Sequence, residues 1–291
     1  EMTIVNFGWY FDIYFRSPGL LVIWCLGISM IILAALIHLS RKAILLVSLI
    51  IIAGHNLLDT VHFNGSVLWS ILHEFAFFKI TEGVEFAVIY PLIPWIAVMS
   101  LGYYFGAFYV QTIEAEKRKR LFNIIGVLAL IAFAILRYTN LYGDPMPYKD
   151  YGSIDQNLIS FFNPSKYPSS LEYLLMTLGA AFIFLANTEN LKGRVVSFFS
   201  TFGRVPFFYY ILHLYFIHLL ACIVAEYTGF GWKTLILEDW VTESPNLKGY
   251  GFPLWVVYVV WVFVILALYP ICKKFDVYKQ NHRDKWWLSY L

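Results

Sequence analysis

Long apolar runs separated by short polar connections dominate this chain. The hydrocarbon core of a bilayer is about 30 Å thick, so about 20 apolar helical residues are needed to cross it. Runs such as 31–37 do not alternate between apolar and polar residues, as the strands of a membrane β-barrel do. The pattern predicts an all-α fold, a polytopic membrane helix bundle with about seven transmembrane helices. They are expected at residues 19–38, 43–59, 84–109, 121–138, 171–187, 205–226 and 252–272.

Lys and Arg are concentrated in one set of connections, which predicts the orientation of the chain. Cytoplasmic connections of membrane proteins are enriched in these residues. The clusters at 41–42 and 117–120, Lys192, Arg194 and the residues after 272 hold many of the 21 cations. We therefore expect these segments and the C-terminus in the cytoplasm, with the long connections at 60–83, 139–170 and 227–251 outside.

This orientation divides the chain into three parts. Seven crossings that end in the cytoplasm place residues 1–18 outside, as an extracytoplasmic interfacial segment, and residues 19–273 form the transmembrane domain. Residues 274–291 form a cytoplasmic C-terminal tail. Since the chain starts at Glu1 without a signal peptide, the same parity predicts that further spans precede it. In the outer connection, residues 67–79 are predicted as an amphipathic interfacial helix.

Composition agrees with a membrane location and excludes one class of partner. Hydrophobic residues make up 60% and charged residues 14% of the chain, whereas soluble domains carry about 25% charged residues. A net charge of +2 without a long Lys/Arg stripe excludes nucleic acid as a partner. The three cysteines, Cys25, Cys222 and Cys272, lie in or beside apolar runs without metal-ligand spacing, so we interpret them as small buried hydrophobes.

The first candidate for chemistry is a group of polar residues at the outer end of the second span. His55, Asp59 and His62 have spacings of four and three, which place them on one helical face. A carboxylate one turn from an imidazole orients it as a general base, and the same side chains are also metal ligands. An ordinary solvated helix end remains the alternative. His73 and Glu74, in the same outer connection, complete either kind of site.

Two histidines lie inside the sixth span, where ionisable residues are costly and suggest function. His213 lies about 12 Å deep, and His218 points about 140° further round the helix. The alternative for each is a neutral histidine bonded to a neighbouring helix. We favour that interpretation for His218 and leave both open for His213.

In the third span, two prolines at 90–95 predict either a kinked helix that lines a cavity or a packing kink.

Two further groups are candidates for binding. Arg137 and Asn140, with Asp144, follow the fourth span on the outside and either bind a polar acceptor or pair with one another. Arg204 is predicted to open the sixth span, with Lys192 and Arg194 nearby. A helix N-terminus beside cations suits phosphate groups. The positive-inside rule also explains these cations without any ligand.

Three stretches, 90–106, 166–179 and 202–218, resemble bacterial members of the heparan-α-glucosaminide N-acetyltransferase-like family of multi-pass membrane proteins. The run Gly54-His-Asn-Leu-Leu-Asp59 is similar to the same group, and the resemblance covers most of the chain. It implies an acyl-CoA donor used from the cytoplasm and a sugar acceptor on the far side. The family's Ser-x-Asp-x-x-Arg-Gly motif and the region of its catalytic histidine are not found here, so that histidine's role is carried onto no residue of this sequence.

Together, the residues and the resemblance predict a membrane-embedded acyltransferase in the bacterial cytoplasmic membrane. It moves an acyl group, expected to be acetyl, from acetyl-CoA to a carbohydrate or glycan acceptor without a metal. We expect catalysis by His55, Asp59 and His213, donor binding by Arg204, Arg194 and Lys192, and acceptor binding by His62, His73, Glu74, Arg137 and Asn140. The rivals are an intramembrane metal-dependent hydrolase and a transporter or lipid-binding module. The expected partners also include the lipid bilayer, and assembly with further copies of this chain as a homo-oligomer is left open.

Overall fold

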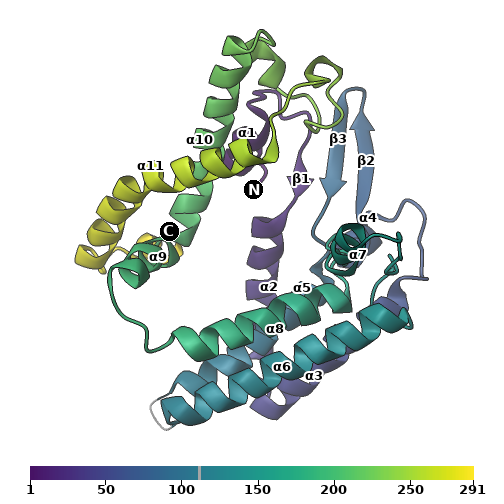
Figure 1. Cartoon of the computed structure of the whole chain (residues 1–291), viewed down its shortest axis with the longest axis vertical. Helices are drawn as coiled ribbons and strands as arrows, with labels where there is room; N and C mark the ends of the chain where they lie inside the picture. The colour runs from purple at the N-terminus through teal and green to yellow at the C-terminus, as the bar shows by residue number, and fades with distance from the viewer. Residues whose placement is uncertain (111–112) are drawn as a thin grey trace. The chain divides into compact units, whose positions relative to one another are not determined.

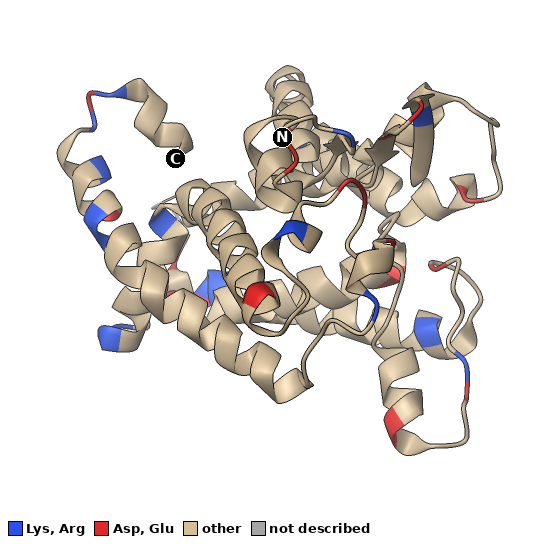
Figure 2. Ribbon diagram, turned by 90° about the horizontal axis from the view of Figure 1, so that it is seen from above, with Lys and Arg blue, Asp and Glu red and all other residues tan. Residues whose placement is uncertain are grey.

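A computed structural model describes residues 1–110 and 113–291 (Figure 1). The chain forms two compact units. The first unit comprises Glu1–Gly19, Lys79–Phe86 and Leu191–Leu291, and the second comprises Leu20–Phe78 and Ala87–Asn190. Most of the ribbon along the long helices is uncharged, as Figure 2 shows.

Six helical segments of the described residues are long and apolar enough to cross a membrane, which confirms an all-α polytopic bundle. The predicted first span is a shorter apolar helix, α2 (Val22–Leu36). The third predicted span begins too early, because residues 84–88 form a strand and its two prolines stand at the start of a helix that begins at Leu92. The six segments are α3 with η1 (Arg41–Leu58), α5 with η2 (Leu92–Tyr109), α6 (Ala115–Thr139), α8 (Leu171–Thr188), α10 (Pro206–Tyr227) and α11 (Leu254–Asn281).

The long connection between α3 and α5 contains a β-hairpin where one amphipathic helix was predicted. Helix α4 (Val67–Leu72) ends early, and strand β2 (Ala76–Thr81) follows. A two-residue turn at Glu82-Gly83 leads into β3 (Val84–Val88), and Gly83 has a φ of 75°, which favours glycine. With β1 (Gly19–Leu20), these strands form a sheet in the order β1-β3-β2. The helix predicted over 67–79 is therefore wrong beyond residue 72.

In the second unit, α6 and α8 run antiparallel and in close contact (Figure 1). Arg118 near the start of α6 bonds Glu189 just after α8, and Arg137 near the end of α6 bonds Glu172 at the start of α8. Between them, Gly126 faces Gly179. A Cβ atom at Gly126 would lie 2.6 Å from the Ile183 side chain and 2.7 Å from the Gly179 carbonyl, so only glycine allows this approach.

Helices α3 (Arg41–Gly54) and α5 (Leu92–Gly106) form the other part of the second unit. Ile52 of α3 belongs to one apolar cluster with Ala97 and Leu101 of α5 and Leu174 of α8. A pocket at the start of α3 is lined by residues from the end of α5, so these two helices also run antiparallel. Consequently the end of α3 and the beginnings of α5 and α8 lie at the same end of this unit.

The first unit is built on α10 and α11. Helix α1 (Ile4–Tyr10) packs on α10, and Tyr10 joins Cys222, Ala225, Leu235 and Leu247 in an apolar cluster. Two 3₁₀ turns, η3 (Trp232–Leu235) and η4 (Pro245–Leu247), carry the last two residues of that cluster. All three cysteines are free and buried, which confirms their interpretation as buried hydrophobes.

The beginning of the sixth span differs from the prediction. A separate helix, α9 (Arg194–Arg204), precedes α10, and the two helices meet at Val205 and Pro206. Arg204 therefore ends α9 and does not open α10. Proline at the first position of α10 explains this boundary, since its ring lacks the N–H that a continuous helix would need there.

Candidate functional site

Polar side chains gather at the end of the second unit where α3 ends and α8 (Leu171–Thr188) begins. His55 is 3% exposed and opens the 3₁₀ turn η1 (His55–Leu58). Its Nδ1 lies 2.9 Å from the Ile52 carbonyl oxygen, and its Nε2 lies 2.9 Å from the Ser169 carbonyl oxygen. Both ring nitrogens face backbone carbonyl oxygens, and the single N–H of a neutral ring donates to one of them. His55 therefore packs between the end of α3 and Ser169, just before α8, with both nitrogens turned toward the backbone.

Asp59 pairs with His73 and not with His55. Asp59 Oδ1 lies 3.0 Å from His73 Nε2, and Asp59 Oδ2 accepts a hydrogen bond from Asn56 at 2.8 Å. Burial raises the pKa of Asp59, but the hydrogen bonds from His73 and Asn56 outweigh it, and the pKa lies below its ordinary value. An ionised Asp59 makes Nε2 the protonated nitrogen of His73.

The other nitrogen of His73 is unused. His73 is 2% exposed, and its Nδ1 is buried without a hydrogen-bond partner in the described part of the chain. A carboxylate that fixes the tautomer and leaves the opposite nitrogen with a free lone pair is the arrangement of a general base. Asp59 therefore orients His73, fourteen residues away in sequence, and not His55 as predicted.

His62 does not share a helical face with His55 and Asp59, so that prediction is wrong. The α-helix ends at Gly54, η1 ends at Leu58, and a turn follows. His62 Nδ1 instead lies 2.6 Å from Glu74 Oε1, in a pair whose side chains are 63% and 27% exposed. An exposed pair of this kind contributes little to stability.

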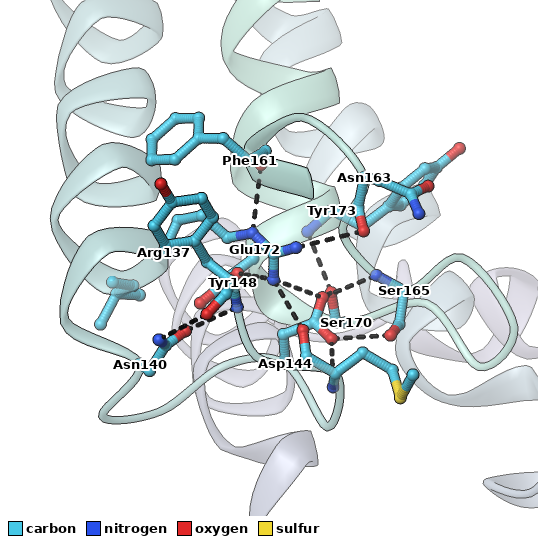
Figure 3. A network of polar contacts seen from close by, with 12 residues as sticks. Arg137, Asn140, Asp144, Tyr148, Phe161, Asn163, Ser165, Ser170, Glu172 and Tyr173 are labelled. Atoms are coloured by element: carbon cyan, nitrogen blue, oxygen red, sulfur yellow. Dashed lines mark hydrogen bonds and ion pairs between the residues drawn. The ribbon is translucent and has the colours of Figure 1, made fainter. Parts of the chain in front are cut away.

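Arg137 lies at the centre of a second polar network, shown in Figure 3. It is 2% exposed, although it belongs to an apolar span. Its five N–H groups all donate: four to backbone carbonyls and one to Glu172 Oε2 at 3.1 Å. The four carbonyls belong to Phe161, Met146, Ser160 and Asn163, at 2.7–3.2 Å. Arg137 therefore holds the loop between α6 and α8 on the end of α6.

Two buried carboxylates accompany Arg137. Glu172 is 2% exposed, and Asp144 Oδ2 lies 3.9 Å from Arg137 Nη1. Asp144 also accepts hydrogen bonds from both the backbone and the hydroxyl of Ser165 and from the Ser170 hydroxyl, at 2.6–2.8 Å. The sequence interpretation missed Glu172, although an acidic residue in an apolar span is the usual signal of a polar site.

Asn140 also bonds within the loop. It ends α6 with a left-handed φ of 51°, which asparagine tolerates, and its amide pairs with both backbone groups of Tyr148.

Beside the network lies a pocket of about 420 Å³, whose lining includes Arg137, Lys149, Tyr151 and Gln156. Within this pocket the Arg137 donors are already used, so Lys149 is its available cation.

The two histidines of α10 have different surroundings. His218 lies with Nε2 2.7 Å from the Leu235 carbonyl oxygen and Nδ1 3.2 Å from that of Gly8, and its ring stacks on Phe11 at 3.9 Å. These contacts agree with the packing interpretation. The His213 ring lies against the rings of Tyr209 and Tyr210 of its own helix, and its Nδ1 lies 3.1 Å from the Tyr209 carbonyl oxygen. Among the described residues, no hydrogen bond joins His213 to another helix.

The three predicted donor-binding cations lie at the two ends of α9. Lys192 and Arg194 are exposed near its start, and Arg204 ends it, roughly 15 Å away at 1.5 Å per residue. Arg204 bonds Asp276 through Nε at 2.9 Å and Nη2 at 2.6 Å. Within residues 1–110 and 113–291, no group of three or more His, Cys, Asp or Glu side chains is arranged to hold a metal ion.

The six apolar spans define a multi-pass membrane protein of the α-helical class with a buried polar network at one end of its second unit. Residues 2–138 match the family model described as heparan-alpha-glucosaminide N-acetyltransferase, catalytic. This match confirms the resemblance carried by the sequence, to a heparan-α-glucosaminide N-acetyltransferase-like family. No curated protein and no solved structure matches the chain.

Proposed function

We propose that the protein is a membrane-embedded acyltransferase that moves an acetyl group from acetyl-CoA in the cytoplasm to a sugar-type acceptor outside, in the bacterial cytoplasmic membrane. The observation that carries this proposal is the position of the family match. Residues 2–138 contain His55, Asp59 and His73, and they exclude His213. The stretch similar to an acetyltransferase catalytic domain therefore contains the dyad with the free imidazole nitrogen.

In the proposed reaction, Asp59 keeps Nε2 of His73 protonated and Nδ1 accepts a proton from the acceptor. As the acceptor's N–H or O–H loses that proton to Nδ1, its heteroatom forms a bond to the acyl carbon. The C–S bond of the thioester breaks, and the departing thiolate takes up a proton from the imidazolium. His55 then acts as a positioning residue, because its ring lies between the Ile52 carbonyl of α3 and the Ser169 carbonyl just before α8.

Acceptor and donor enter from opposite sides of the membrane in this proposal. The 420 Å³ pocket beside Arg137 lies in the outer loop, so it suits a polar acceptor, with His62 and Glu74 as predicted additional contacts. The donor approaches the end of the first unit that carries Arg204, and contacts from Lys192 and Arg194 stay predictions. His213 stays a predicted catalytic residue, since no hydrogen bond to another helix of the described residues occupies its ring nitrogens.

Direct assay tests the proposal. Purified protein in phosphatidylcholine nanodiscs is incubated with radiolabelled acetyl-CoA and glucosamine, and acetylated product is separated and counted. We expect product above the level of empty nanodiscs, unchanged by a chelator. Acetyl-CoA left intact with every amino sugar tried would overturn the transferase. Activity that chelation removes and zinc restores would favour the metal-dependent hydrolase.

A further inference from the structure

The end of α11 (Leu254–Asn281) and the C-terminal turn η5 (Trp286–Tyr290) enclose a pocket of about 330 Å³, all of it within the first unit. Figure 2 shows Lys and Arg residues close together along this last part of the chain. Leu288, at 2% exposure, packs the turn against the rest of the first unit and lines the pocket. Four cations and one carboxylate are among its lining residues: Arg204, Lys279, Arg283, Lys285 and Asp276.

The carboxylate neutralises only one of these cations. Asp276 is held by the guanidinium of Arg204, and its Oδ1 also accepts a hydrogen bond from Gln280 at 2.8 Å. Its side chain is 5% exposed, against 45% for Arg204, so the pair lies at the inner wall with part of the guanidinium outward. Lys279 acts on the charge of Asp276 without forming an ion pair with it, and no ion pair among the described residues joins Arg283 or Lys285 to a carboxylate.

Those three cations have neutral partners or none. Lys279 donates to the Arg204 carbonyl at 2.9 Å, and Lys285 donates to the Tyr278 hydroxyl at 2.7 Å. Arg283 is exposed and forms no hydrogen bond or ion pair with the described part of the chain. Like charges that converge on one concave site repel each other, and a bound anion removes that repulsion.

Phosphate is the anion that fits this set of donors best. Arginine forks and lysine ammonium groups bind phosphate oxygens through charge-assisted hydrogen bonds. Trp286, 76% exposed, adds an open aromatic face for an adjoining flat or apolar group. The positive-inside rule accounts for cations near a cytoplasmic membrane surface, but not for their convergence around a pocket.

We propose that this pocket binds a phosphate-bearing ligand, through Arg283 and Lys285 above all. The phosphate belongs either to a soluble nucleotide or to the headgroup of an anionic phospholipid, which share this chemistry. Assignment to the nucleotide part of the acyl donor rests on the proposed function, whereas phosphate binding by itself does not.

Binding measurements without turnover test the pocket. Parent protein and the R283Q/K285Q variant are placed in phosphatidylcholine nanodiscs and titrated with adenosine 3′,5′-bisphosphate at fixed salt. K117Q/K119Q is the matched control, because it removes two exposed cations on α6 that do not line the pocket. We expect at least tenfold weaker binding in R283Q/K285Q and parent affinity in the control. In parallel, native mass spectrometry counts phosphatidylglycerol molecules retained from mixed nanodiscs.

Each outcome decides the proposal. Nucleotide binding that depends on Arg283 and Lys285 supports it with a soluble ligand, and retention of phosphatidylglycerol with the same dependence supports it with a lipid. If neither depends on these residues in protein that elutes and melts like the parent, the proposal is overturned. If the parent binds nucleotide but transfers no acetyl group, the proposed function is overturned and the phosphate site is kept. If the parent transfers acetyl groups but its binding does not depend on Arg283 and Lys285, the phosphate site is overturned and the proposed function is kept.

Discussion

At the scale of single residues, most of the buried polar groups around the candidate site have internal partners in the described part of the chain, and His73 is an exception. Arg137 uses five donors, and both nitrogens of His55 and His218 face carbonyl oxygens. The Nδ1 atom of His73 has no partner in the described residues. An unsatisfied buried group costs about 1–3 kcal/mol, and such sites concentrate where function requires them.

His73→Gln should lower acetyl transfer about a hundredfold or more, because the variant lacks the nitrogen that accepts the proton. Single-turnover transfer with saturating acetyl-CoA measures this. His38→Gln is the matched control, since that side chain is exposed and lies outside the proposed site. Folding of both variants is checked by size-exclusion elution and thermal melting. A folded His73→Gln protein with the parent rate would show that the histidine only packs.

Arg137→Met should destabilise the protein by about 3–5 kcal/mol, because it leaves Glu172 and Asp144 buried without their cation. Lys149→Met, which removes an exposed cation of the same pocket, should change stability little. Thermal unfolding in one detergent compares the variants. Adding Glu172→Gln to Arg137→Met should recover part of the loss. Equal melting of Arg137→Met and parent would mean that the network does not stabilise the fold.

At the scale of elements, short polar side chains and glycines determine where helices end and how closely they pack. The Ser170 hydroxyl caps α8, accepting a hydrogen bond from the Tyr173 backbone at 3.1 Å and donating one to Asp144. Asn56 accepts a hydrogen bond from the Leu171 backbone at 2.8 Å. These bonds join the end of α3, the loop that follows α6 and the start of α8. Asp59 and His73 lie next to these hydrogen-bonded segments.

Gly126→Ala should destabilise the second unit although alanine favours helix. The new Cβ would meet Ile183 and the Gly179 carbonyl, and overpacking of this kind costs about 1–3 kcal/mol. Gly102→Ala in α5 is the control, because nothing lies within 4 Å of a Cβ atom there. That variant should keep or raise the melting temperature. Equal melting temperatures of the Gly126→Ala and Gly102→Ala variants would indicate that α6 and α8 do not approach closely at Gly126.

At the scale of the whole molecule, helix directions within each unit bear on the proposed orientation. In the second unit, one end carries Arg41 and Arg118, at the starts of α3 and α6. The opposite end carries the Asp59–His73 dyad and the Arg137 network. Charged connections at one end and a polar site at the other suit a donor and an acceptor on different sides of a membrane.

Cysteine labelling in intact cells tests this orientation. D155C and N246C, at exposed outer-loop positions, should react with an impermeant thiol reagent. E116C and N281C, also exposed, should react only after lysis. The three native cysteines are buried, so they contribute a low background. The reverse pattern would exchange the donor and acceptor sides and with them the proposed direction of transfer.

The sequence by itself determined the spans and the location of the polar chemistry. Crossing a membrane requires a local run of apolar residues, and hydropathy is a local property. The spans predicted at 171–187 and 205–226 accordingly agree within a residue with α8 (Leu171–Thr188) and α10 (Pro206–Tyr227). The histidines, Asp59 and Arg137 were recognised for the same reason, as polar residues within or beside apolar runs.

Only the tertiary structure decided which of these residues are partners. Asp59 bonds a histidine 14 residues away, Arg137 an acid 35 away and Arg204 an acid 72 away. Helical spacing ranks neighbours only within one continuous helix, and the chain leaves α3 before Asp59. Pairing across turns and helices depends on packing, such as the Gly126–Gly179 crossing. It is packing that made His55 a structural tie and left His73 with the free nitrogen.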